Sequence, residues 1–209
     1  MAAVTVPRAT LLRRGLLLEY LTVGWNIVEG IVAVGAGVMA GSPSLIGFGV
    51  DSFVETTSGG ILVWRLRGEA SGRLDEEAIE RVERRAERFV GAAFLLLAAY
   101  VAWDSIQALM NRDEPAPSPV GIVLTAVSIA VMLWLARAKR EAGEALGSHA
   151  LIADSKQTYA CWYLSMTALA GLALNALFGL WWADPVAALA IVVLLVREGI
   201  EAMRGEDDD

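Results

Sequence analysis

The sequence predicts an all-α membrane protein with six transmembrane helices. The chain has 209 residues, is 56% hydrophobic and has a mean hydropathy of +0.52, which is more apolar surface than a soluble domain of this size buries. Six stretches are long and apolar enough to cross about 30 Å of hydrocarbon, which takes about 20 helical residues. These stretches cover residues 16–40, 45–64, 89–110, 120–136, 151–180 and 185–203.

The connections between the stretches carry turn-forming residues. Gly41-Ser42-Pro43-Ser44 separates the first two stretches, a segment with three prolines spans 114–119, and Asp184-Pro185 opens the last stretch. Proline suits the first turn of a helix, so these segments predict sharp helix boundaries.

The basic residues predict the orientation. Positive charge concentrates on the cytoplasmic side of membrane proteins. Basic residues lie before the first stretch, between the second and third, between the fourth and fifth, and after the sixth. They are Arg8, Arg13, Arg14, Arg65, Arg67, Arg73, Arg81, Arg84, Arg85, Arg88, Arg137, Lys139, Arg140 and Arg204. The opposite connections carry only Arg112. Both termini are therefore predicted to be cytoplasmic, and residues 74–88 to form an amphipathic cytoplasmic extension of the third helix.

Residues 1–209 are interpreted as a single transmembrane domain in the plasma membrane. No cleavable signal peptide is evident, and because only a short acidic tail at 206–209 follows the last helix, no soluble C-terminal domain is expected. The single cysteine, Cys161, excludes an intramolecular disulfide framework and a cysteine-rich zinc site. The net charge of −7 gives no indication of a nucleic-acid partner.

Two carboxylates four residues apart lie in the second stretch. Asp51 and Glu55 occupy one face of a helix, one turn apart. Ionisable groups at membrane depth are costly, and two adjacent acids repel unless a cation or a proton lies between them. We therefore favour metal or proton binding over a structural pair bonded to neighbouring helices.

The fifth stretch carries a polar stripe at helical spacing. Asp154, Gln157, Thr158 and Cys161 follow at i, i+3, i+4 and i+7 in an otherwise apolar span. A Cys161 thiolate favours zinc or cadmium, whereas carboxylate oxygens alone suit manganese or magnesium. A lone buried cysteine is often an apolar filler, so both interpretations of Cys161 stay open.

Structural interpretations account for most other polar residues at membrane depth. Asn26 and Glu29 are expected to hydrogen-bond between helices, Asp184 to be a hydrated helix cap, and Lys156 to extend its amine to the cytoplasmic interface. His149, the only histidine, precedes the fifth span and is a candidate ligand at its cytoplasmic mouth. Close helix approach is predicted at Gly47, Gly49, Gly59, Gly60 and Gly171.

The order of these features resembles the cation diffusion facilitator family. The resemblance is carried by SLIGFGVDSFVE at 44–55, ADSKQT at 153–158 and WADPVA at 182–187, and it extends over nearly the whole chain. It implies six helices with cytoplasmic ends, a metal held midway across the membrane between the second and fifth helices, and exchange of zinc or a related ion for protons.

The resemblance also assigns positions. The second-helix ligands of the family correspond to Asp51 and Glu55. The fifth-helix pair, which is His or Asp followed by Asp in the family, corresponds to Gln157 and Cys161 and departs from the pattern. Most members also carry a cytoplasmic metal-binding domain that helps them dimerise, so a homodimer here is expected to form through membrane helices.

We therefore predict a secondary transporter that exports a divalent metal ion, zinc foremost, in exchange for protons by alternating access, with no resident cofactor. The candidate ligands are Asp51, Glu55, Asp154, Gln157 and Cys161. The alternative is a membrane protein that kept the fold but senses metal or binds a partner without transport, which the departures in the fifth helix favour. An enzyme is not expected, because no nucleophile with its base, phosphate-binding loop or cofactor motif is evident.

Overall fold

The computed structural model describes residues 8–71 and 76–204, with only the backbone of residues 69–71, 76–87, 89 and 90. Within these residues the chain forms six helices, one for each predicted span: α1 (Arg8–Ala40), α2 (Pro43–Ser71), α3 (Glu76–Asn111), α4 (Pro119–Leu146), α5 (His149–Phe178) and α6 (Ala183–Arg204). The all-α prediction is confirmed. The amphipathic side-chain pattern predicted for 74–88 lies outside the described side chains, and the acidic tail at 206–209 lies outside the described residues.

The composition of the helices fits a membrane. Among the described residues four helical segments are individually long and apolar enough to span a bilayer: α1, residues Gly91–Asn111 of α3, α4 and α5. Large apolar side chains face outward, as Leu96, Trp103 and Leu177 do. Because lipid is the favourable environment for such a surface, the chain is a multi-pass membrane protein.

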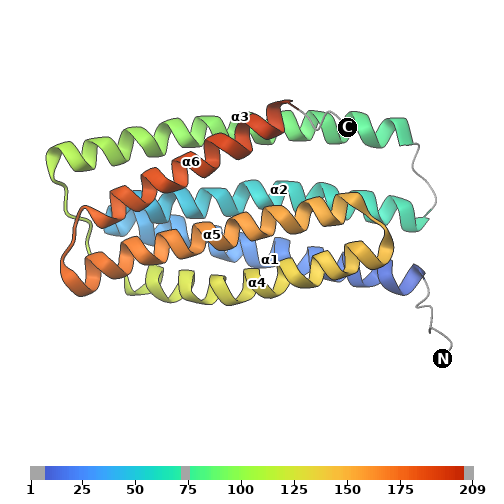
Figure 1. Ribbon diagram of the computed structural model, residues 1–209, viewed down its shortest axis with the longest axis horizontal. Coiled ribbons are helices and arrows are strands. Elements are labelled where there is room, and N and C mark those ends of the chain that lie inside the picture. Colours follow the sequence, from blue (N-terminus) through green and yellow to red (C-terminus); the bar gives the residue numbers. More distant parts are fainter. Residues whose placement is uncertain (1–7, 72–75, 205–209) are drawn as a thin grey trace.

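Successive helices run in opposite directions along an elongated bundle (Figure 1). We call the end at which α1 begins and α6 finishes the terminal end, and the opposite end, with the α1–α2, α3–α4 and α5–α6 connections, the far end. The two ends of the described chain therefore lie on one side, as the distribution of basic residues predicts. The assignment of this side to the cytoplasm stays a prediction.

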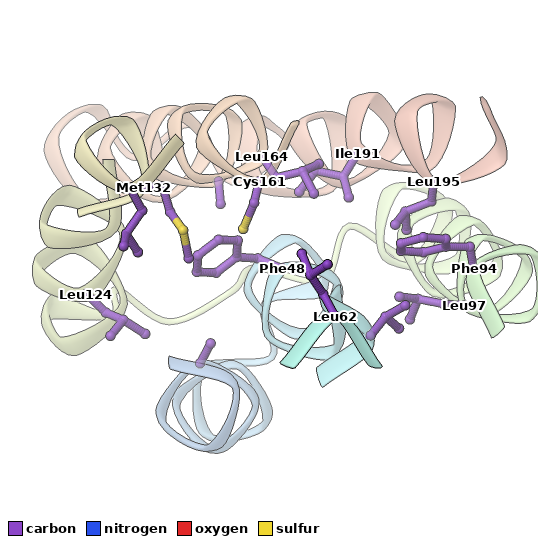
Figure 2. Close-up of a cluster of buried hydrophobic side chains, with 14 of the residues drawn as sticks. Phe48, Leu62, Phe94, Leu97, Leu124, Met132, Cys161, Leu164, Ile191 and Leu195 are labelled. Carbon is purple, nitrogen blue, oxygen red and sulfur yellow. The ribbon is translucent and has the colours of Figure 1, made fainter. Parts of the chain in front are cut away.

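Helix α2 lies at the centre of the bundle. The closest helix pairs are α1–α2, α4–α5 and α3–α6, and α2 also contacts α3, α5 and α6. Figure 2 shows core side chains along α2: Phe48 lies beside Met132 and Cys161, and Leu62, several turns further along α2, lies on the side of Leu97. Because α2 contacts α1, α3, α5 and α6, its side chains take part in most of the helix contacts of the bundle.

Serines and glycines set several helix boundaries. The Ser118 and Ser148 side chains accept hydrogen bonds from Gly121 N and Leu151 N, and so cap the first turns of α4 and α5. The helices α4 and α5 finish at Gly147 and Gly179, whose φ values of 69° and 65° are left-handed.

Buried polar contacts fasten the far end. Ser42 and Ser44, in and after the α1–α2 turn, donate hydrogen bonds to the Asp184 carboxylate at the start of α6. Asn175 Nδ2 donates to the Pro115 carbonyl at 2.7 Å. The prediction that Asp184 is hydrated is wrong, because this turn covers it and its side chain is buried.

Small residues allow close helix contacts at several crossings. A Cβ on Gly49 would lie 2.8 Å from the Cβ of Ala33 on α1, and a Cβ on Gly91 would lie 2.8 Å from the carbonyl oxygen of Gly199 on α6. The predicted close approach is confirmed at Gly49. It is wrong at Gly60, where no described atom lies within 4 Å of the added Cβ.

These two glycines of α2 give a matched test of packing. We expect Gly49→Leu to destabilise the protein by about 2 kcal/mol or more, because overpacking forces α1 and α2 apart. Gly60→Leu should change stability by less than about 0.5 kcal/mol. Thermal unfolding in detergent measures both, and equal melting temperatures for the two variants would contradict this account of the α1–α2 contact.

Candidate metal centre

A small pocket lies between α2 and α5 on one side and α3 and α6 on the other. Its space of about 10 Å³ has the size of roughly one water molecule. The polar lining comprises Asp51, Glu55, Gln157, Cys161 and Glu198, and the apolar lining comprises Phe94, Ala160, Leu164, Leu194 and Leu195. The structure thus brings together four of the five ligands that the sequence suggested and adds Glu198.

Helix geometry aims the α2 carboxylates and the α5 thiol at the same pocket. Asp51 and Glu55 lie one turn apart and are both buried. Cys161 is only 2% exposed, and it lines the same pocket as both carboxylates. Oxygen and sulfur donors therefore face one another across the α2–α5 contact.

The two oxygens of Glu55 have different surroundings. Oε1 accepts a hydrogen bond of 3.1 Å from Thr158 Oγ1. Oε2 is buried and has no hydrogen-bond partner among the described residues. An unpartnered buried carboxylate oxygen is costly, so Glu55 has a free position for a cation or a proton.

Acidic side chains dominate the field at Asp51. The charges that act on it come from Glu55, Glu29 and Glu198. Glu198 is half-buried and reaches the pocket from α6. The sequence interpretation missed Glu198, although its spacing from Leu194 and Leu195 by four and three residues places it on the same inward face.

Gln157 contributes a neutral side chain to the lining. Its Oε1 accepts a hydrogen bond of 3.1 Å from Ser58 Oγ on α2. Gln157, which departs from the acidic or histidine pattern of the family, thus links α5 to α2. A carboxylate at this position would instead add to the repulsion around Asp51 and Glu55.

Asp154 is turned to a different partner. It forms an ion pair with Lys139 of α4, whose Nζ also lies 3.3 Å from Glu19 Oε1 of α1. The placement of Lys139 in a cytoplasmic loop is wrong. Helix α4 continues past the predicted end at residue 136 to Leu146, and its inward face carries Lys139 into the bundle, where the side chain is 0% exposed.

A line of polar contacts joins this ion pair to the pocket. Lys139 Nζ donates to Thr158 Oγ1 at 3.2 Å, and the Thr158 hydroxyl is in turn within hydrogen-bond distance of Glu55 Oε1. We call Glu19, Lys139 and Asp154 the lysine cluster. Thr158 is the link between the lysine cluster and the candidate metal pocket.

A further acid lies between α1, α2 and α4. The predicted interhelical hydrogen bonding of Glu29 is confirmed, because its carboxylate accepts from Ser52 and Ser128. Asn26 is buried as well, but neither of its amide atoms has a hydrogen-bond partner among the described residues, so the same prediction fails there.

Two basic residues at the start of α5 face outward. His149 is the first residue of the helix and is exposed at the terminal end, and its role as a ligand at the mouth stays a prediction. Lys156 is exposed as predicted.

The pocket is not a closed metal site in this conformation. Among the side chains that the structure describes, no three His, Cys, Asp or Glu residues are grouped tightly enough to hold a metal ion. The donors share a pocket without surrounding one point.

Comparison with known proteins decides the family. Residues 20–204 match the cation efflux transmembrane domain. The chain belongs to the cation efflux family. This confirms the resemblance to cation diffusion facilitators.

A curated relative of this cation efflux protein is named as a transporter. The chain is 24% identical over 186 residues to "Uncharacterized transporter sll1263" of Synechocystis sp. (strain ATCC 27184 / PCC 6803 / Kazusa). The match covers 88% of this chain and 60% of the relative, so the chain spans about three fifths of the length of that protein.

The sole thiol of this cation efflux protein reports on the pocket. We expect Zn²⁺ to slow alkylation of Cys161 by N-ethylmaleimide at least about tenfold, because a metal-bound thiolate is not free to react. Asp51→Asn should remove most of this protection, since it deletes a donor from the same pocket. Labelling is followed by mass spectrometry of the intact chain.

The matched control is Glu141→Gln, which alters an exposed carboxylate of α4 that pairs with Arg14. This variant should keep the protection by Zn²⁺. Protection that persists unchanged in Asp51→Asn would show that Cys161 and Asp51 do not share a bound ion.

Proposed function

We propose that this cation efflux protein exports a divalent transition-metal ion from the cytoplasm across the plasma membrane, with zinc as the first candidate, in exchange for protons. The observation that supports the proposal most directly is the buried pocket in which Asp51, Glu55 and Cys161 meet inside a membrane bundle. Acids at such depth mark ion pathways when no base neutralises them.

The donor chemistry favours a borderline or soft ion. Asp51 and Glu55 offer carboxylate oxygens, and Cys161 offers a thiolate once its proton has left. Mixed oxygen and sulfur donors suit Zn²⁺ or Cd²⁺ better than Mg²⁺ or Mn²⁺. The carbonyl oxygen of Gln157 is available as a weaker donor if its bond to Ser58 breaks.

Proton exchange follows from the same donors. Carboxyl and thiol groups must lose protons before they bind a metal ion, so loading of the pocket releases protons. After the ion leaves, protons return to the acids, which limits their mutual repulsion. Metal and protons thus alternate in the pocket, which is the requirement for antiport.

The contacts suggest which helices move. Hydrogen bonds and ion pairs link α1, α2, α4 and α5 through Glu29, Thr158, Lys139 and Gln157. The α3–α6 pair packs through its own glycine crossing, and Asp184 attaches α6 to the α1–α2 turn at the far end. Because the pocket lies between these two groups of helices, a shift of one against the other would open it to alternate sides.

A second candidate function is metal sensing or partner binding without transport. The observation that favours it is the lack of a closed set of metal ligands among the described residues. This alternative predicts binding without flux, so a transport assay separates it from export.

The test is metal flux in proteoliposomes. We expect vesicles with an acidic interior to accumulate Zn²⁺, because protons leaving the vesicle drive the metal inward. Asp51→Ala and Glu55→Ala should each lower this flux at least about tenfold, since each deletes a charged donor. Cys161→Ser should lower Zn²⁺ and Cd²⁺ flux more than Mn²⁺ or Fe²⁺ flux.

Glu141→Gln again serves as the control and should transport as the wild type does. Loss of uptake when an ionophore collapses the pH gradient supports antiport. Unchanged flux in Asp51→Ala or Glu55→Ala would remove α2 from the mechanism, and absence of flux for every metal with binding intact would favour the sensing function.

Glu198 provides a separate test of the pocket boundary. A half-buried acid that lines the pocket attracts cations toward it, because low-dielectric walls focus its field. We expect Glu198→Gln to raise the KM for Zn²⁺ about three- to tenfold with little change in the maximal rate. The exposed neighbour in Glu201→Gln is the matched control, and equal KM values for both variants would place Glu198 outside the ion path.

A further inference from the structure

The lysine cluster combines one buried ammonium group with two buried carboxylates from different helices. Lys139 of α4 lies between Glu19 of α1 and Asp154 of α5, and the three side chains are 0%, 0% and 6% exposed. Taking one partner out of such an arrangement leaves an uncompensated buried charge, which is strongly destabilising. A charged group must therefore occupy the space between Glu19 and Asp154 whenever both acids are ionised.

Three side-chain oxygen atoms lie around the Lys139 ammonium group. Glu19 Oε1 at 3.3 Å, Asp154 Oδ2 and Thr158 Oγ1 at 3.2 Å converge on Lys139 Nζ. Neither Glu19 oxygen has a hydrogen-bond partner by strict geometry among the described residues, so its carboxylate faces the ammonium by charge alone. Two carboxylates and a hydroxyl are donors that a hard metal cation also accepts.

We propose that Lys139 is a tethered cation that fills a second cation site formed by Glu19, Asp154 and Thr158. The ammonium group takes the place of a free metal ion at this site. The two acids of the cluster are then unavailable to a mobile ion, and binding is confined to the pocket of Asp51, Glu55 and Cys161. Asp154, although it belongs to the polar stripe of α5, is thereby assigned to the lysine cluster.

This assignment goes beyond the proposed transport function. It concerns which ions the bundle holds, and it can be tested on protein at equilibrium. Thr158 separates the lysine cluster from Glu55 by a single hydroxyl group. A metal ion bound between Glu19 and Asp154 in place of the ammonium group would therefore lie close to the pocket of Asp51, Glu55 and Cys161.

The experiment counts Mn²⁺ ions, because oxygen donors without sulfur suit Mn²⁺. Purified full-length chain in detergent is titrated with Mn²⁺, and the free ion is followed by electron paramagnetic resonance. We expect Lys139→Met to bind one more Mn²⁺ per chain than the wild type. Adding Asp154→Asn to Lys139→Met should remove the additional ion, and an unchanged count in Lys139→Met overturns the proposal.

Lys156→Met is the matched control, because it deletes an exposed lysine of α5 and changes the net charge equally. It should bind as many Mn²⁺ ions as the wild type. An equal gain in Lys156→Met would trace the additional ion to net charge and overturn the proposal. The count is independent of flux, so a wild type that transports no metal would reject the transport proposal and leave this one standing.

Folding provides a second measurement in case Lys139→Met is too unstable to purify. Produced in membranes, this variant should give a higher folded yield when Mn²⁺ is added to the medium, whereas the wild type should not respond. The neutral triple variant Glu19→Gln/Lys139→Met/Asp154→Asn should fold without added Mn²⁺, because no charge is left unpaired. A Lys139→Met yield that Mn²⁺ leaves unchanged counts against the tethered cation.

Discussion

The structure depends on how charge is compensated inside a bundle that has lipid around it. Among the described residues, the buried charged side chains are the acids Glu19, Glu29, Asp51, Glu55, Asp154 and Asp184 and the base Lys139. Pairs of serine hydroxyl groups bond to two of the acids: Ser42 and Ser44 donate to Asp184, and Ser52 and Ser128 donate to Glu29. The interior still carries more acid than base, and this excess is the physical basis of the proposed cation binding.

The location of the pocket follows from the two faces of α2. One face binds α1 and sets Ser52 against Glu29, while another turns Asp51 and Glu55 toward α5 and the α3–α6 pair. A hydrogen bond from Ser52 to Glu29 joins α2 to α1. Apolar side chains such as Phe94 and Leu195 form much of the contact between α2 and the α3–α6 pair (Figure 2). Apolar contacts are non-directional, so α3 and α6 are able to shift against α2 beside the pocket, while Asp184 keeps α6 attached at the far end.

Sequence patterns predicted most of the fold because hydropathy determines which segments enter lipid and turn residues determine where they stop. Helical spacing predicted that Asp51 and Glu55 share one face of α2, and the family resemblance predicted that they meet Cys161 between the second and fifth helices. Lys139 was misplaced because counting basic residues as cytoplasmic ignores ones that find acidic partners from other helices. Such pairing is a tertiary property: Glu19 lies 120 positions before Lys139, and nothing local to either residue indicates the contact.

Gln157 and Cys161, the two positions of α5 that depart from the family pattern, are consistent with this distribution of charge. Lys139 neutralises one of the two acids of its cluster and interacts with the other, so Asp51 and Glu55 remain as the pair that a mobile cation must balance. A divalent ion matches the charge of two carboxylates.

A third and fourth carboxylate at positions 157 and 161 would increase repulsion in the empty pocket, where Glu198 and Glu29 already act on Asp51. Gln157 adds no charge, and a thiol adds negative charge only when it loses its proton to a metal. The departure from the family pattern therefore lowers the electrostatic cost of the pocket without a metal ion, and in the proposed transport cycle it leaves the Cys161 thiol as a ligand for the bound ion.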